Sequence, residues 1–227
     1  MPADADTVAS RTNVPSVKPR WRGVSHHYGF FVALALGAFA VGLAPFGIAT
    51  FAAVLYSVGL VAMFGVSALY HRGTWSTAQA ARMLKLDHTT IFLMIAGTCT
   101  AVALLAIDGV FGVVVLAAVW SITAFGIVVE WTPWRAPQGY VTTVYLMLGW
   151  VGALGVVGLW SSTGITGVAL IAAGGVLYTV GAIVHATHRP DPWPTVFGYH
   201  EIFHAFVIGG ALLHYIALTV LVFPLGA

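Results

Sequence analysis

The chain has 227 residues, of which 59% are hydrophobic and only 7% are charged, and its formal net charge is +2. Soluble domains carry roughly 25% charged residues, so this composition excludes a water-soluble globular domain and indicates a chain that lipid solvates. The small net charge gives no indication of nucleic-acid binding. The single cysteine, Cys99, excludes an internal disulfide and a cysteine-based zinc cluster.

The first 25 residues differ in composition from the rest of the chain. They are polar, and they end in a basic patch that contains Lys18, Arg20 and Arg22. No apolar stretch precedes a small-residue cleavage site here, so a signal peptide is not expected. We predict a flexible polar and basic tail over residues 1–25.

Seven later stretches are apolar enough to cross a bilayer, which takes roughly 20 residues of a helix. They cover residues 28–44, 47–70, 88–107, 110–129, 140–160, 166–185 and 199–223. Turn-forming residues such as Pro45, Gly109 and Pro133 lie between them. We predict an all-α membrane protein, with a bundle of seven transmembrane helices over residues 26–227 and no second domain.

The Lys and Arg residues predict the orientation of this bundle, because these side chains collect on the cytoplasmic side of a membrane. If the N-terminus lies inside, all nine fall on that side: Arg11, Lys18, Arg20, Arg22, Arg72, Arg82, Lys85, Arg135 and Arg189. The opposite turns contain none of them. We predict a multi-pass protein of the cytoplasmic (plasma) membrane, with its N-terminus in the cytoplasm and its C-terminus outside.

Three histidines form the first candidate site, because polar groups in membrane helices are costly and often functional. His200 and His204 are four residues apart on one face of the last helix, where two imidazoles can bind one metal ion. His71 ends the second helix at the same predicted depth. Catalytic zinc commonly has three protein ligands and one open position. We predict a zinc site at His71, His200 and His204, although two histidines at this spacing alone are more often structural or interfacial.

The other histidines have simpler interpretations. His26 and His27 begin the first span, and we place them at the level of the lipid headgroups. His185 and His188 end the sixth span and are expected at the interface. His214 lies deeper, ten residues after His204, and is expected to be a hydrogen-bonded packing residue.

Two further polar residues share the predicted depth of the zinc site. Asp87 opens the third predicted span and could hold or deprotonate a water molecule. Ser67 lies one turn before His71 on the same helical face and could hydrogen-bond that water or an oxyanion. The alternatives are that Asp87 is only a helix N-cap and that Ser67 only bonds to a backbone carbonyl.

Residues 200–204 also match the short pattern H-E-x-x-H, in which the glutamate of soluble metalloproteases acts as a general base. Glu201 can instead be an acidic residue in the first turn of a helix, where the helix dipole favours it. We prefer this second interpretation.

Three spaced motifs resemble those of the hemolysin III family, which belongs with the progestin and adipoQ receptors, including the adiponectin receptors. Residues 67–71 (SALYH) are similar to the S-x-x-x-H motif of that family. Residues 86–100 resemble its third-helix signature, and residues 200–215 resemble its seventh-helix signature. The resemblance covers nearly all of the chain after about residue 18 and has the same order of motifs.

This resemblance implies seven helices, a cytoplasmic N-terminus and zinc bound by His71, His200 and His204. It also implies that Asp87 contacts the water at the zinc and that Ser67 lines the site. Some members of the family act as ceramidases, and the wider superfamily is proposed to contain metal-dependent lipid amide hydrolases.

We therefore expect a zinc-dependent hydrolase of a lipid amide or ester, with membrane lipids as partners and an acyl lipid as substrate. No protein partner is indicated by the sequence. Two alternatives stay open: a receptor or sensor with structural zinc, and a pore-forming or membrane-homeostasis protein without catalysis.

Overall fold

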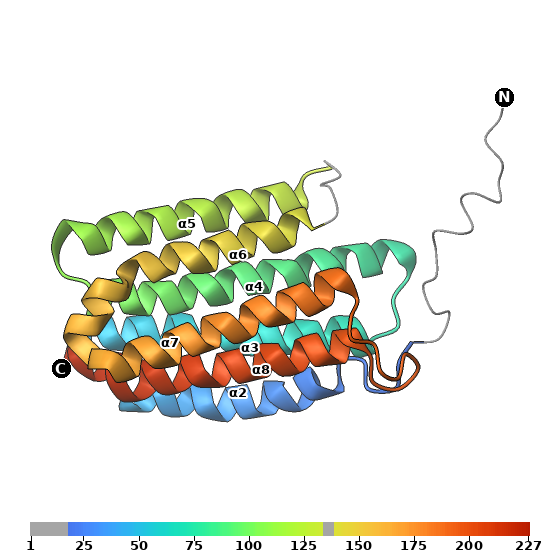
Figure 1. Ribbon diagram of the computed structural model, residues 1–227, viewed down its shortest axis with the longest axis horizontal. Coiled ribbons are helices and arrows are strands. Elements are labelled where there is room, and N and C mark those ends of the chain that lie inside the picture. Colours follow the sequence, from blue (N-terminus) through green and yellow to red (C-terminus); the bar gives the residue numbers. More distant parts are fainter. Residues whose placement is uncertain (1–17, 134–138) are drawn as a thin grey trace.

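The computed structural model describes residues 18–133 and 139–227, and within these ranges the chain is helical and has no strand. The α-helices are α2 (Val24–Leu43), α3 (Ile48–Arg72), α4 (Thr77–Leu105), α5 (Gly109–Trp131), α6 (Tyr140–Gly152), α7 (Val156–Thr187) and α8 (Tyr199–Ile216). A π-helical turn, Ala217–Val222, and a 3-10 turn, Phe223–Gly226, follow α8. The helices lie side by side in one elongated bundle (Figure 1). The predicted all-α fold is confirmed.

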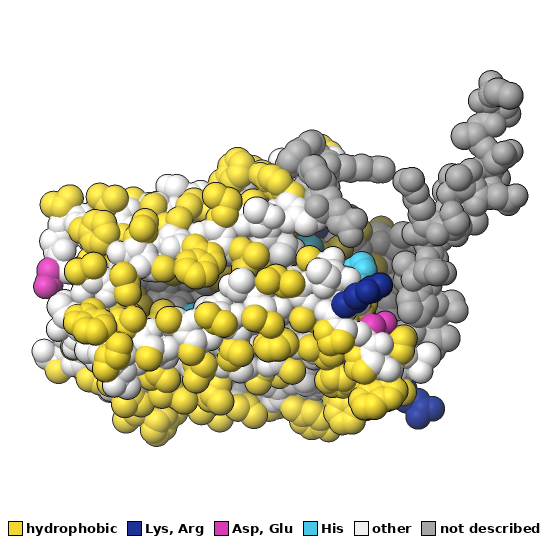
Figure 2. Space-filling view, viewed as in Figure 1, with side chains coloured by type: hydrophobic (Ala, Val, Ile, Leu, Met, Phe, Trp, Pro, Cys, Tyr) yellow, Lys and Arg dark blue, Asp and Glu magenta, His cyan; other side chains and the backbone are white. Residues whose placement is uncertain are grey.

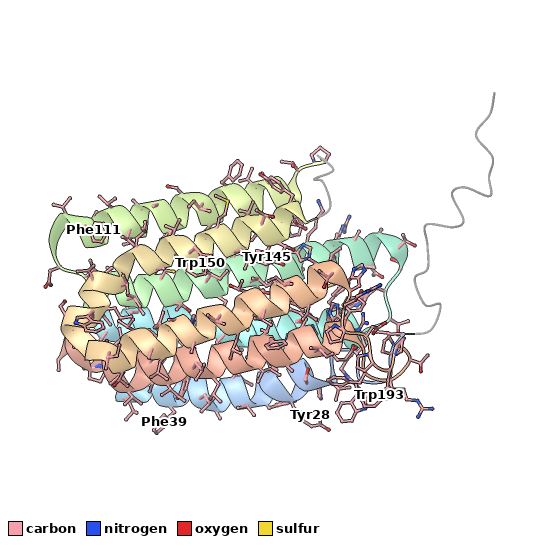
Figure 3. The ribbon with its side chains drawn as sticks, viewed as in Figure 1. Tyr28, Phe39, Phe111, Tyr145, Trp150 and Trp193 are labelled. Atoms are coloured by element: carbon pink, nitrogen blue, oxygen red, sulfur yellow. The ribbon has the colours of Figure 1, made fainter. Side chains whose placement is uncertain are left out.

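Large apolar side chains cover the outside of this bundle. Figure 2 shows an almost continuous hydrophobic flank between the two ends. Phe39 points away from it (Figure 3), and the exposed fractions of Phe39, Phe111 and Trp150 are 59%, 48% and 61%. Such an exposed apolar surface is incompatible with water and is the expected surface of a chain in lipid. The protein is a multi-pass integral membrane protein.

Six described segments are long and apolar enough to cross a membrane, where the sequence predicted seven. The difference lies in Tyr140–Thr187, a segment of 48 residues that contains the fifth and sixth predicted spans. Gly164 interrupts this segment with a left-handed φ of 65° and a ψ of −163°. Figure 1 shows α6 and most of α7 running in opposite directions on either side of this region.

Helix α4 begins at Thr77, well before the third predicted span. Ser76 caps it: the backbone N–H of Gln79 donates to the Ser76 hydroxyl, and the Gln79 amide oxygen accepts from the backbone N–H of Ser76. This reciprocal capping starts the helix in a polar segment that hydropathy does not detect. The prediction that Asp87 opens the helix is therefore wrong, and so is the alternative that it is an N-cap. Asp87 lies inside α4.

Glycines bring α3 and α4 into close contact. A Cβ atom added to Gly59 would lie 3.2 Å from Cα of Met94, and one added to Gly97 would lie 3.2 Å from Cα of Tyr56. Small residues at such contacts let the backbones of membrane helices approach closely. The two helices that carry His71 and Asp87 are thus held against each other.

The described basic residues gather at one end of the bundle. They precede α2, end α3, lie near the start of α4 or follow α7: Lys18, Arg20, Arg22, Arg72, Arg82, Lys85 and Arg189. Arg11 and Arg135 lie outside the described residues. Asp108, in the turn between α4 and α5, is at the opposite end.

Candidate metal centre

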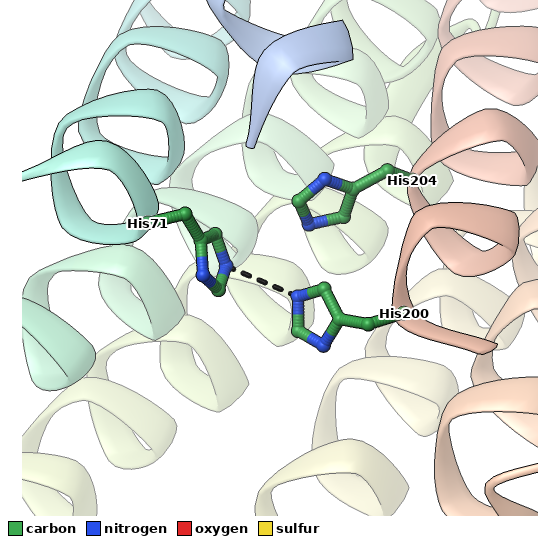
Figure 4. A group of neighbouring side chains, drawn as sticks. All are labelled: His71, His200 and His204. Atoms are coloured by element: carbon green, nitrogen blue, oxygen red, sulfur yellow. Dashed lines mark hydrogen bonds between the residues drawn. The ribbon is translucent and has the colours of Figure 1, made fainter. Parts of the chain in front are cut away.

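Three imidazoles converge at the basic end of the bundle. His71 comes from the last turn of α3, and His200 and His204 come from the first turns of α8. One ring nitrogen of each lies within 4.8 Å of the other two (Figure 4). The Nε2 atoms of His71 and His200 are 3.1 Å apart. The structure therefore brings together the three residues that the sequence predicted as ligands.

This arrangement fits a metal ion. Two nitrogens that bind one zinc ion at about 2.0–2.1 Å with tetrahedral geometry lie roughly 3.3 Å apart, close to the spacing of the His71 and His200 nitrogens. His71 and His204 are buried, and the Nδ1 atom of His204 has no hydrogen-bond partner among the described residues. Buried imidazoles with nitrogens facing one another are favourable when a cation lies between their lone pairs. The three histidines can hold a metal ion.

Asp87 lies beside this group. Its Oδ2 atom is 3.8 Å from Nε2 of His71, and its side chain is 13% exposed. It lies on α4, so three helices contribute to the centre. The position allows the carboxylate to accept a hydrogen bond from a water molecule or a substrate at the metal.

Ser67 is buried one turn before His71, as the sequence predicted, and a fourth histidine contacts it. The Nδ1 atom of His26 and the hydroxyl oxygen of Ser67 share a hydrogen bond of 2.8 Å. The His26 ring is also stacked on the ring of His204, with 3.7 Å between centroids and 7° between planes. His26 thus contacts one metal-binding candidate and the serine at the same time.

His26 faces the bundle and not the lipid, because it is 2% exposed, and its predicted depth at the level of the lipid headgroups did not indicate this orientation. Depth along a helix does not tell whether a residue faces lipid or the bundle. The spacing of small residues gives that information: Ala33, Gly37 and Ala40 are the other buried residues of α2, and His26 lies seven residues before Ala33. His27, the next residue, is exposed, as predicted for the interface.

We expect His26→Ala to weaken zinc binding by about 10- to 100-fold, because residues that orient metal ligands typically contribute this much. His26→Phe should keep most of the affinity, since an aromatic ring can still stack on His204. A competition titration with a chelating dye measures both, with the exposed His27→Ala as the matched control. Wild-type affinity in His26→Ala would show that the stacking has no influence on the metal.

The Glu201 carboxylate is held by two hydrogen bonds. Its Oε2 atom accepts the backbone N–H of Gly198 at 2.8 Å, and its Oε1 atom accepts from Nε of Arg22 at 2.6 Å. Both carboxylate oxygens are therefore engaged, and the side chain is 3% exposed. Glu201 lies in the first turn of α8, where the helix dipole favours an acidic residue.

The segment before α2 closes the site from the basic end. The backbone N–H groups of Arg20 and Trp21 donate to the carbonyls of Thr195 and Val196, in the loop that precedes α8. Gly23 has a left-handed φ of 73°, and a Cβ atom there would lie 2.6 Å from Cβ of His71. Only glycine therefore allows the chain to pass so close to this histidine.

Three more histidines lie in different environments. His185 is half-buried, and its ring centroid is 5.1 Å from that of His200. His188 is exposed at the end of α7, in agreement with its predicted interfacial position. His214 is buried, and its Nε2 atom is bonded to the carbonyl of Ile171, so its predicted packing role is confirmed.

A cavity of about 740 Å³ leads from the metal-binding candidates into the bundle. Lys18, Arg22 and the three histidines line the cavity at the basic end of the bundle, and its other walls are mostly apolar. It extends between α6 and α7 as far as Leu159 and Val168. Figure 2 shows a hollow in the apolar flank in the region of these two helices. Burial and the nearby charges of Arg22 and Arg72 lower the pKa of Lys18 at this end of the cavity.

The chain is similar in sequence to known proteins. Residues 16–215 match the family described as Haemolysin-III related. A Bacillus subtilis (strain 168) protein named Hemolysin-3 homolog is 31% identical over 157 residues, which are 69% of this chain and 70% of that protein. A Bacillus cereus protein named Hemolysin-3 is 32% identical over 139 residues, 61% of either chain, so the match spans less than two thirds of its length.

A plant protein is similar over a shorter region. The Arabidopsis thaliana protein named Heptahelical transmembrane protein 5 is 46% identical over 46 residues, which are 18% of this chain and 12% of that protein. The family match, in contrast, extends from the segment before α2 into the last turn of α8 and includes every residue of the candidate centre. The chain therefore belongs to the haemolysin-III-related family.

Proposed function

We propose that this protein is a zinc-dependent hydrolase that cleaves the amide or ester bond of a membrane lipid. One observation carries the proposal: the group of three imidazoles, with Asp87 and Ser67 beside it, opens into a long cavity whose deeper walls are mostly apolar. A polar reaction centre joined to an apolar chamber suits a substrate with a polar bond and a long hydrocarbon chain.

The ligands favour zinc among the biological metals. Imidazole suits zinc, copper, iron and nickel, and sites with three histidines and an open position are typical of catalytic zinc. Zinc bound here would polarise a carbonyl group and lower the pKa of water toward about 7. His71, His200 and His204 would hold it.

Asp87 and Ser67 have positions that suit hydrolysis. The Asp87 carboxylate would take a proton from the attacking water as the oxygen–carbon bond forms, and would give it to the leaving nitrogen or oxygen as the old bond breaks. The Ser67 hydroxyl, held by His26, would hydrogen-bond the water or the carbonyl oxygen. Glu201 takes no part, because both of its oxygens are engaged elsewhere.

We further propose that the chain crosses the membrane seven times, with the centre at the cytoplasmic side. A straight helix of 48 residues would be about 72 Å long, more than twice the hydrocarbon thickness, so Tyr140–Thr187 suits two crossings separated near Gly164. The name of the plant relative, a heptahelical protein, is consistent with this number. The described Lys and Arg residues support a cytoplasmic location of the basic end, by the positive-inside rule.

The test is turnover by the purified, full-length protein in lipid nanodiscs. Labelled ceramides, other N-acyl lipids and lipid esters are offered as substrates, and bound metal is measured by elemental analysis. We expect release of a fatty acid from one lipid class, loss of release after chelation, and recovery with added zinc.

Other results would favour the alternatives. Zinc bound at one ion per chain without turnover on any lipid would contradict the hydrolase and favour a sensor with structural zinc. The Bacillus cereus relative is named for haemolysis, so leakage of dye-filled vesicles without lipid cleavage would favour membrane permeabilisation instead. Recovery by another metal, and not by zinc, would contradict the proposed cofactor.

A further inference from the structure

Two polar side chains, Tyr178 on α7 and His214 on α8, line the same cavity far from the metal-binding candidates. Their rings are in contact, with 5.3 Å between centroids and 76° between planes. His214 follows His204 by ten residues on α8, which corresponds to about 15 Å along a helix. The two side chains are thus polar groups in a mostly apolar part of the cavity. The proposed mechanism does not use them.

His214 carries a hydrogen-bond acceptor that no described residue occupies. Its Nε2 atom is 3.0 Å from the carbonyl oxygen of Ile171. A carbonyl only accepts, so Nε2 of the neutral imidazole carries the hydrogen and Nδ1 carries a lone pair. The side chain keeps 9% exposure although it lies inside the bundle and lines the cavity.

Tyr178 offers a hydrogen-bond donor beside it. Its hydroxyl oxygen is buried and has no hydrogen-bond partner among the described residues. A buried hydroxyl without a partner is unfavourable, and native structures usually satisfy such groups with a protein atom, a water molecule or a ligand. The Tyr178 hydroxyl is thus an unsatisfied donor on a ring that contacts the imidazole of His214.

Glycines make room for the pair. A Cβ atom on Gly174 would lie 2.5 Å from Nε2 of His214, and one on Gly210 would lie 3.0 Å from the Tyr178 ring. Both glycines lie where α7 and α8 pack together. Any larger residue at Gly174 would displace the imidazole, so the local sequence keeps space for this ring.

We propose that Tyr178 and His214 bind a hydroxyl group on the hydrocarbon chain of the lipid in this cavity. A hydroxyl group can donate to Nδ1 of His214 and accept from Tyr178 together, whereas a carbonyl or ether only accepts and a methylene does neither. The inference rests on the proposed function, because it concerns the chain of the same lipid. From the helical rise, that hydroxyl lies on the order of ten carbon atoms from the bond at the metal centre.

The test measures binding rather than turnover. The zinc-loaded, full-length protein in nanodiscs is titrated with octadecanoic acid and with isomers that carry one hydroxyl group at successive chain positions. We expect isomers hydroxylated near the middle of the chain to bind about tenfold more tightly than the plain acid, the effect of one good buried hydrogen bond. Equal affinity for all the isomers and the plain acid would overturn the inference. Tyr178 and His214 would then form hydrogen bonds only with an internal water molecule.

Variants show whether these two residues cause the preference. Tyr178→Phe removes one oxygen and keeps the ring, and His214→Leu removes both imidazole nitrogens and with them the acceptor. Each should abolish the preference while the plain acid binds as before. Tyr145→Phe is the matched control, because Tyr145 lines another part of the cavity and its hydroxyl donates to Thr142; the preference should survive there. A preference that survives in Tyr178→Phe would overturn the assignment.

Parallel turnover measurements separate this inference from the proposed function. Mid-chain preference without hydrolysis would overturn the hydrolase and leave the hydroxyl subsite standing. Hydrolysis with a flat binding profile would overturn the subsite alone. No binding of any of the acids would overturn both, because the cavity would then not hold an acyl chain.

Discussion

Replacing His200 and His204 together by alanine is expected to lower the affinity of the purified protein for zinc by more than about a hundredfold, since loss of ligands exceeds the 10- to 100-fold typical of their supporting residues. Elemental analysis should then fall from one ion per chain to none. The physical reason is geometric: both imidazoles come from the first turns of α8, and His71 alone leaves a single nitrogen at the site.

A control with two exposed histidines replaced makes the result specific. His27→Ala and His188→Ala together also remove two imidazoles, but both side chains are exposed and lie outside the group of three. This double variant should retain one zinc ion per chain. Equal metal content in His200→Ala/His204→Ala and the wild type would show that the metal, if any, binds elsewhere. Thermal unfolding with and without zinc adds a second readout, because a ligand that binds only the folded state raises its stability.

Hydropathy predicts the membrane-spanning helices because lipid solvates only segments with apolar surfaces. It does not detect the part of a helix that is polar. The first part of α4 is polar and extends beyond the predicted span, so its start depends on the hydrogen bonds of Ser76 and Gln79. The interruption at Gly164, in contrast, lies between the predicted spans 140–160 and 166–185, where Ser161, Ser162 and Thr163 are polar.

The candidate centre could be predicted from the sequence because helix direction alternates along the chain. The end of the second predicted span and the start of the last one therefore have the same depth, which placed His71 beside His200 and His204. Rotation about the helix axis was harder to predict. His26 and His27 have the same depth, yet only His26 faces the bundle, and the small residues of α2 were the signal for this.

The cavity and the Tyr178–His214 pair could not be read from the sequence. A cavity depends on how side chains of several helices meet, and no local pattern specifies that volume. The contact between the two rings joins residues of α7 and α8 through Gly174 and Gly210. Helix packing of this kind is a tertiary property that periodicity does not encode.

Asp87→Asn is expected to lower kcat for lipid hydrolysis by about 10²- to 10⁴-fold, the usual contribution of general acid–base catalysis, while zinc content stays at one ion per chain. The amide has nearly the same size and can still accept one hydrogen bond, but it cannot take the proton of the attacking water. Since Oδ2 of Asp87 is 3.8 Å from Nε2 of His71, the change leaves the three imidazoles in place. Turnover and elemental analysis on the same sample measure both quantities.

The control and the pattern of kinetic constants decide what a loss of activity means. Asp108→Asn removes a carboxylate at the opposite end of the bundle, where the side chain is exposed, and should leave kcat unchanged. If Asp87→Asn raised KM and left kcat unaltered, Asp87 would contribute to substrate binding and not to proton transfer. If it lowered zinc content together with kcat, the carboxylate would act through the ligand His71, and another group would have to move the proton.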